Sequence, residues 1–111
     1  MEADWTSALA RARDHAPFLR RALERQPALA ALLAAGASEA ALAAARAAGE
    51  DAAETGAALR RERLALALVL AVGDLAGAFP LARVMGELSS FADRALDRAI
   101  TEAIARRVPD R

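Results

Sequence analysis

An arginine cluster, Arg60, Arg61 and Arg63, is the densest group of side chains that could bind a ligand, and only Glu62 interrupts it. Guanidinium groups form paired hydrogen bonds with phosphates and carboxylates, so the cluster is suited to a nucleotide or an acidic partner. The same spacing is also typical of a solvated helix face with local ion pairs. On the residues alone, we favour the solvated face.

The acidic side chains form no obvious catalytic set. Asp74 follows an apolar run, and we expect it to bond an arginine or to cap a neighbouring helix. Asp93 and Asp97 lie one helical turn apart, after Ser89 and Ser90, and two carboxylates at this spacing can bind a divalent cation. Because no third ligand is evident, we favour a solvated face and predict no metal site.

The composition excludes most enzyme chemistry. All 15 basic residues are arginine, so Schiff-base and phosphate-loop lysines are absent; without cysteine there is no disulfide, thiol nucleophile or thiolate metal site. The single histidine, His15, follows Asp14 and is more typical of a hydrogen-bond partner at a helix end than of a metal ligand. The residues therefore favour a helical packing or interaction unit that binds no cofactor.

Charge and hydropathy restrict where the chain works. The 15 basic and 15 acidic residues cancel, so no net field attracts nucleic acid or an anionic membrane. The longest strongly apolar run, Leu64 to Gly73, is too short to cross a bilayer. The acidic residues 1–4 do not resemble the start of a signal peptide, so we expect a cytoplasmic protein.

The composition predicts an all-α helical bundle, which we take to be a single domain over residues 1–111. Alanine accounts for 34 residues, whereas valine, isoleucine and tyrosine, which favour strands, are scarce. Proline and glycine divide residues 1–49 into short helices, with Pro17 and Pro27 in first turns and Gly36 ending the third helix.

Two further features belong to these short helices. Asp4 or Thr6 is suited to cap the first of them, and Ser38 is suited to cap the fourth, over residues 39–48. Leu42 is the only large apolar residue of that fourth helix. We therefore expect it to be mobile or thinly packed.

The second half, residues 50–108, is predicted to form a long antiparallel hairpin of two helices, over 51–77 and 80–107. Gly56 is a weak point within the first of them, so a start nearer Ala57 is the alternative. In the second of these, apolar residues from Leu81 to Ile104 recur every three or four positions, which predicts a one-sided amphipathic helix. Charged residues lie off this apolar stripe, namely Arg83, Glu87, Arg94, Arg98 and Glu102.

Residues 64–77 are apolar around the whole helix and must be covered on all sides, by the short helices, by a second copy or by further polypeptide. Folding the hairpin places Leu70 near Leu88. Gly73 and Gly77 form a small-xxx-small pair, which we interpret as a slot for close helix approach that receives Met85 or a neighbouring side chain.

Residues 57–107 contain motifs in a characteristic order: an Arg-Arg-x-Arg helix that ends in Asp-Leu-x-Gly, a short turn, and Leu-Ser-x-x-Ala-Asp. In this order they resemble the N-terminal segment of the glutamine synthetase adenylyltransferases, also called glutamate–ammonia-ligase adenylyltransferase/adenylyl-removing enzymes. A looser resemblance covers the earlier His-x-Pro-Phe-Leu and Pro-x-Leu segments. The matching positions are Arg60, Arg61, Arg63, Asp74, Leu75, Gly77, Leu88, Ser89, Ala92 and Asp93, with His15, Pro17, Phe18, Leu19, Pro27 and Leu29 in the looser part.

The resemblance implies a fragment, the helical lead-in to the catalytic domain that removes AMP from adenylylated glutamine synthetase. That domain holds magnesium through Gly-Ser and Asp-x-Asp motifs; neither occurs here, so no catalytic residue carries over. For the whole enzyme it implies glutamine synthetase, the PII signal protein, ATP and magnesium as partners. The motif positions with an expected structural or domain-contact role are Arg60, Arg61, Arg63, Asp74, Gly77, Ser89 and Asp93.

Two other hypotheses remain open from the residues. One is a stand-alone helical adaptor that homodimerises through the apolar helix at 64–77. The other is a small-ligand binder whose arginine cluster, Arg60 to Arg63, holds an anion at the end of the bundle.

Overall fold

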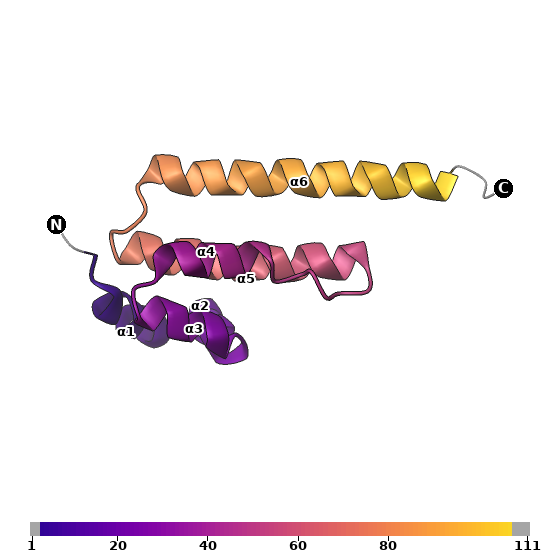
Figure 1. Cartoon of the computed structure of the whole chain (residues 1–111). Helices are drawn as coiled ribbons and strands as arrows, with labels where there is room; N and C mark the ends of the chain where they lie inside the picture. Colours follow the sequence, from indigo (N-terminus) through magenta and orange to yellow (C-terminus); the bar gives the residue numbers. More distant parts are fainter. Residues whose placement is uncertain (1–2, 108–111) are drawn as a thin grey trace.

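The computed structural model describes residues 3–107, which form six α-helices and, within that range, no strand (Figure 1). The predicted all-α fold is confirmed, and the two long helices at the C-terminal end pack together. The helices are α1 Trp5–His15, α2 Pro17–Arg25, α3 Pro27–Ala34, α4 Ser38–Arg46, α5 Thr55–Leu75 and α6 Leu81–Arg107.

Local signals explain most of the short-helix boundaries. The Asp4 carboxylate accepts a hydrogen bond from the Ser7 N–H at 3.0 Å and caps α1. Pro17 and Pro27 are the first residues of α2 and α3, where a missing N–H costs nothing. Ser38, in contrast, is the first residue of α4 and makes no cap, so the prediction for its side chain was wrong.

The ends of α5 differ in how well the sequence predicts them. The helix begins at Thr55, between the two starts considered at Asp51 and Ala57, because the backbone of Glu54 is extended, with φ -111° and ψ 143°. At the other end, Gly77 has φ +78° and the Ala78 N–H bonds the Gly73 carbonyl at 2.9 Å. This arrangement satisfies the last carbonyls of the helix and favours glycine at position 77.

The core lies around α5: helices α1, α2 and α3 cover it on the side away from α6, and α4 packs beside α5, across it in the view of Figure 1. Contrary to expectation, α4 is well packed: Ala41, Leu42 and Ala45 are completely buried. Their small side chains let α4 approach α5 closely, so the helix does not need many large anchors.

Helix α6 lies alongside α5 as a separate layer, and none of its residues is buried (Figure 1). The molecule is accordingly elongated, with extents of 58 × 28 × 22 Å. The way in which α6 is held, and the face that it leaves exposed, are the features of this fold that bear most directly on function.

Candidate functional site

The turn before α6 is fixed by Phe79, whose buried ring packs directly on Gly73. Gly73 thus provides the predicted slot, but it receives Phe79 rather than Met85, which is 54% exposed. Met85, the occupant named in the prediction, stays outside because the turn after Gly77 folds back at once and Phe79 fills the slot. Trp5 meets the Phe79 ring edge to face, with centroids 6.4 Å apart.

The start of the chain supports the same turn. The Asp4 N–H donates to the Ala76 carbonyl at 3.0 Å, and the Arg11 guanidinium donates to the Leu75 carbonyl at 2.7 Å. These are C-terminal carbonyls of α5, which lack partners within the helix and carry partial negative charge. The N-terminal segment therefore holds the end from which α6 departs.

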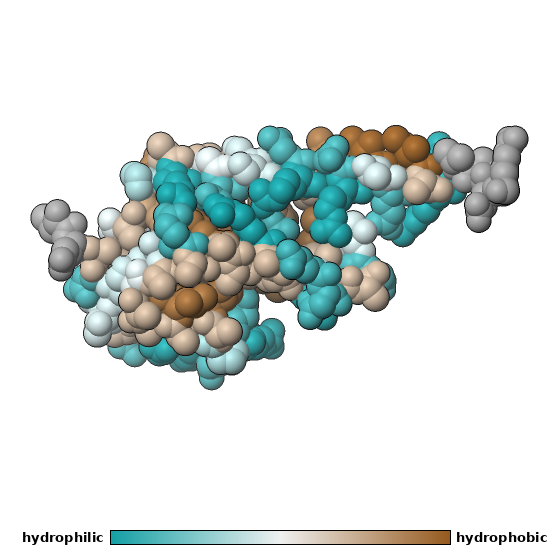
Figure 2. Space-filling view, in the orientation of Figure 1, coloured by the Kyte–Doolittle hydropathy of each residue, from teal (hydrophilic) through white to brown (hydrophobic). Residues whose placement is uncertain are grey.

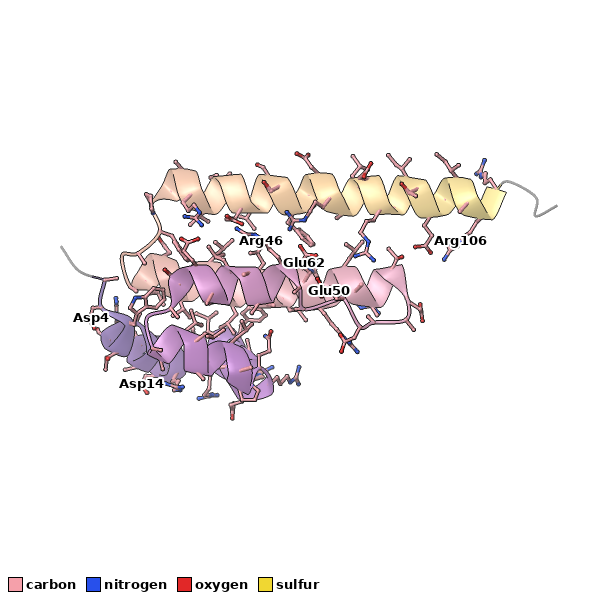
Figure 3. All side chains as sticks on the ribbon, viewed as in Figure 1. Asp4, Asp14, Arg46, Glu50, Glu62 and Arg106 are labelled. Atoms are coloured by element: carbon pink, nitrogen blue, oxygen red, sulfur yellow. The ribbon has the colours of Figure 1, made fainter. Side chains whose placement is uncertain are left out.

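Three arginine–carboxylate contacts hold α6 over the bundle. Arg46 of α4 binds Glu87 of α6 through two hydrogen bonds of its Nη2, at 2.6 and 2.8 Å. Figure 3 shows Arg46 and Glu62 in the layer between α6 and the other helices. The other two contacts are Arg83 to Glu39 at 2.8 Å and Arg94 to Glu62 at 2.5 Å.

These contacts change the acidity of two carboxyl groups. Hydrogen bonds from Arg46 hold the pKa of Glu87 below its ordinary value of 4.5, against the opposing effect of burial. A hydrogen bond from Arg83 likewise lowers the pKa of Glu39. Arg83 also bonds Glu87 at 3.3 Å, so four side chains from α4 and α6 share one charge network.

Glu62 is the one buried charged residue among those that the structure describes, with 7% of its surface exposed. In the sequence it only interrupts the arginine cluster. Its helical spacing from the buried residues Ala58, Leu66 and Val69, however, places it on the inner face of α5. This spacing could have identified Glu62 as a buried residue from the sequence. A buried carboxylate requires a partner, and Arg94 provides it.

The outer face of α6 is apolar and has no partner within the described residues. Figure 2 shows a hydrophobic ridge along the part of α6 nearest its C-terminal end. The helix thus turns charged residues inward and leaves much of its apolar stripe in solvent. The large exposed side chains of α6 are Leu81, Met85, Leu88, Leu96, Ile100 and Ile104, each 42–74% exposed, and of these Leu81 and Leu88 lie at the edge nearest α5.

Only part of the apolar stripe meets α5. Val84 and Phe91 are half-buried against the core, and Leu70 and Leu88 line one shallow pocket between the two helices, as the predicted hairpin requires. Asp74 lines the same pocket and is exposed.

The other predicted motif positions do not converge on one site. Arg60, Arg61 and Arg63 are all exposed, and Arg61 approaches Asp51 at 3.7 Å in a loose surface pair. Gly77 ends α5, as described above. On α6, Ser89 and Asp93 are exposed to solvent.

Two further findings concern sites considered from the sequence. Within residues 3–107, no three acidic or histidine side chains are grouped so as to hold a metal ion. The helices described here include none with both the length and the apolarity to cross a membrane.

Together, these features define an all-α protein in which a long amphipathic helix is held by ion pairs over a small bundle and keeps an apolar face exposed. A family model for glutamate-ammonia ligase adenylyltransferase matches residues 3–111, and the chain belongs to that family. No match was found among curated proteins or among solved structures.

Proposed function

We propose that this chain is a non-catalytic helical unit of a glutamate-ammonia ligase adenylyltransferase, and that the outer face of α6 docks it onto the catalytic part of the enzyme. The observation that carries this proposal is the exposed apolar row from Leu81 to Ile104, on a helix with no buried residue. Within the full enzyme the unit would serve the AMP-removing half, with cytoplasmic glutamine synthetase as the protein acted on and the PII signal protein as a further partner.

The charge network explains why the apolar face points outward. Turning α6 about its axis to bury Leu96 and Ile100 would break the contacts of Glu87 and Arg94 and leave Glu62 without a cation. Covering the outer face with another protein surface keeps those ion pairs. Full burial of each half-exposed Leu, Ile or Met would contribute about 1 kcal/mol.

The non-catalytic role is supported by the residues themselves. The sequence contains neither a Gly-Ser pair nor an Asp-x-Asp motif, which the family's nucleotidyltransferase domain uses to hold magnesium. Glu39, Glu62 and Glu87 are engaged by arginines. ATP and magnesium are accordingly proposed to act in another part of the enzyme.

No observation favours the alternative of homodimerisation through residues 64–77. Most of this segment is already buried within one chain, including Leu66, Leu68, Val69 and Val72. A dimer through it would have to displace the short helices.

The test measures binding of this chain to a nucleotidyltransferase domain from the same family, by calorimetry and sedimentation. We expect a one-to-one complex that Leu96→Glu/Ile100→Glu weakens at least about tenfold, because two charges would enter an apolar interface. Ser90→Glu/Thr101→Glu adds the same charge at two other exposed positions of α6 and should bind like the unmodified chain.

Two outcomes would contradict the proposal. Equal binding by both double variants would show that the outer face is not the docking surface. AMP transfer to, or AMP removal from, glutamine synthetase by the isolated chain would show that the unit is itself catalytic.

A further inference from the structure

A second feature stands apart from α6 and from its proposed docking. A pocket of about 510 Å³ lies between α2, the first half of α5 and the linker after α4. Three arginines line it: Arg21 and Arg25 from α2, and Arg61 from α5. No carboxylate is among its lining residues.

The pocket also has an apolar wall. Phe18 and Leu64 both line it, and their side chains are 53% and 42% exposed. Outside α6, these are the most exposed large apolar residues that the structure describes. Half-exposed apolar side chains beside a cavity gain free energy when a ligand covers them.

The helical spacing brings these side chains to one place. Phe18, Arg21 and Arg25 are three and four residues apart and share one face of α2. On α5, Arg61 and Leu64 are three residues apart and face α2 across the pocket. Of the cluster Arg60, Arg61 and Arg63, for which anion binding was the alternative to a solvated face, only Arg61 lines this pocket.

The charges of this pocket are weakly compensated. Among residues 3–107, Arg21 and Arg25 form no ion pair, and Arg61 has only the loose 3.7 Å contact with Asp51. Asp51 belongs to the linker, as does Glu50, which is labelled in Figure 3. Since the Asp51 side chain is 89% exposed, solvent screens the pair, and an incoming anion can replace it.

We propose that this pocket binds an organic phosphate monoester with a flat apolar body. The phosphate would accept hydrogen bonds from the three guanidinium groups, whose planar donors match phosphate oxygens. The flat body would lie against Phe18 and Leu64. The volume of the pocket is in the range typical of small-molecule sites.

The probe is 1-naphthyl phosphate, and its binding to the 111-residue chain is measured by calorimetry. Two matched compounds separate the contributions of ring and charge to binding: 1-naphthol has the ring without the charge, and inorganic phosphate has the charge without the ring. We expect 1-naphthyl phosphate to bind at least about tenfold more tightly than either, because both halves of the pocket contribute.

Variants locate the site. Arg21→Ala/Arg25→Ala should weaken binding of 1-naphthyl phosphate about tenfold or more, and Phe18→Ala should weaken it several-fold. Arg20→Ala/Arg13→Ala is the matched control, since it removes the same charge from exposed positions outside the pocket. It should bind within about twofold of the unmodified chain. Circular dichroism checks that every variant keeps its helices.

Several results would overturn the proposal. If both double arginine variants weakened binding of 1-naphthyl phosphate equally, the loss would be explained by net charge and not by the pocket. Binding of 1-naphthol as tight as that of the phosphate would indicate an apolar patch alone, and equally tight inorganic phosphate would remove the role of Phe18 and Leu64. Absence of binding at millimolar 1-naphthyl phosphate would dispose of the site altogether.

Discussion

At Gly73, an added methyl group would overlap the ring of Phe79, which is itself buried between α5 and Trp5. Because Phe79 is only 4% exposed, its ring could move away only by displacing buried neighbours. A glycine in a helix usually lowers stability relative to alanine, so this position retains glycine for packing reasons.

We therefore predict opposite effects of one substitution at two helical glycines. Gly73→Ala should lower the free energy of unfolding by about 1–3 kcal/mol through overpacking. Gly86→Ala lies in α6, where a Cβ would meet nothing within 4 Å, and it should raise stability by about 0.5–1 kcal/mol. Urea denaturation of both variants measures this, and stabilisation by Gly73→Ala would refute the close contact.

The contact between Glu62 and Arg94 supports a second prediction at the residue scale. Arg94→Ala leaves a carboxylate that is 7% exposed without its cation and should cost about 1–2 kcal/mol. This figure is below that for a fully buried pair because the Arg94 side chain is 43% exposed, and solvent screens it.

Arg98→Ala is the matched control on the same helix, because Arg98 is exposed and has no ion pair within the described residues. Its effect should stay within about 0.5 kcal/mol. Equal losses in the two variants would mean that the Glu62 contact contributes nothing. The double variant Glu62→Gln/Arg94→Ala should recover part of the loss, since no buried charge is left unpaired.

At the scale of elements, the attachment of α6 depends on carboxylates and therefore on pH. Arginine hydrogen bonds lower the folded-state pKa values of Glu87 and Glu39 from 4.5. Their contribution to stability is fully present above the unfolded pKa and is lost as the pH falls through the lowered folded pKa. We predict that the chain loses stability below about pH 4.5, beginning with the contact between α4 and α6.

Denaturation at a series of pH values checks this prediction in three chains. Glu87→Gln should be less stable than the unmodified chain at pH 7 and should lose less stability on acidification. Glu24→Gln, at an exposed position of α2 outside the charge network, should follow the unmodified chain. Parallel acid profiles for the unmodified chain and Glu87→Gln would exclude Glu87 as the titrating group.

How well the sequence predicted each element depended on whether its signals were local. Pro17, Pro27 and Gly36 act within one turn, and the helices that they begin or end lie where expected. The prediction that α4 is thinly packed was wrong, because the close approach of its alanines to α5 depends on tertiary structure. The orientation of α6 also depends on residues that are distant in sequence, since ion pairs with Arg46 and Glu62 on other helices determine which face of α6 turns inward.

At the scale of the whole molecule, the candidate surfaces come from residues that the sequence separates. The pocket combines Phe18, Arg21 and Arg25 with Arg61 and Leu64, about forty residues later. The spacing of these residues within each helix can be seen in the sequence, but the packing of α2 against α5 cannot. The exposed stripe of α6 was visible as a pattern, whereas its lack of a partner became apparent only in three dimensions.

The hydrogen bonds from Asp4 and Arg11 to the end of α5 also constrain the order of assembly during synthesis. The first helix leaves the ribosome well before its partners, because the carbonyl of Leu75 belongs to a residue 64 positions after Arg11. Until then, α1 to α4 lack the helix around which they pack. The bundle therefore closes late, and the nascent N-terminal half stays in its least protected state until Phe79 emerges.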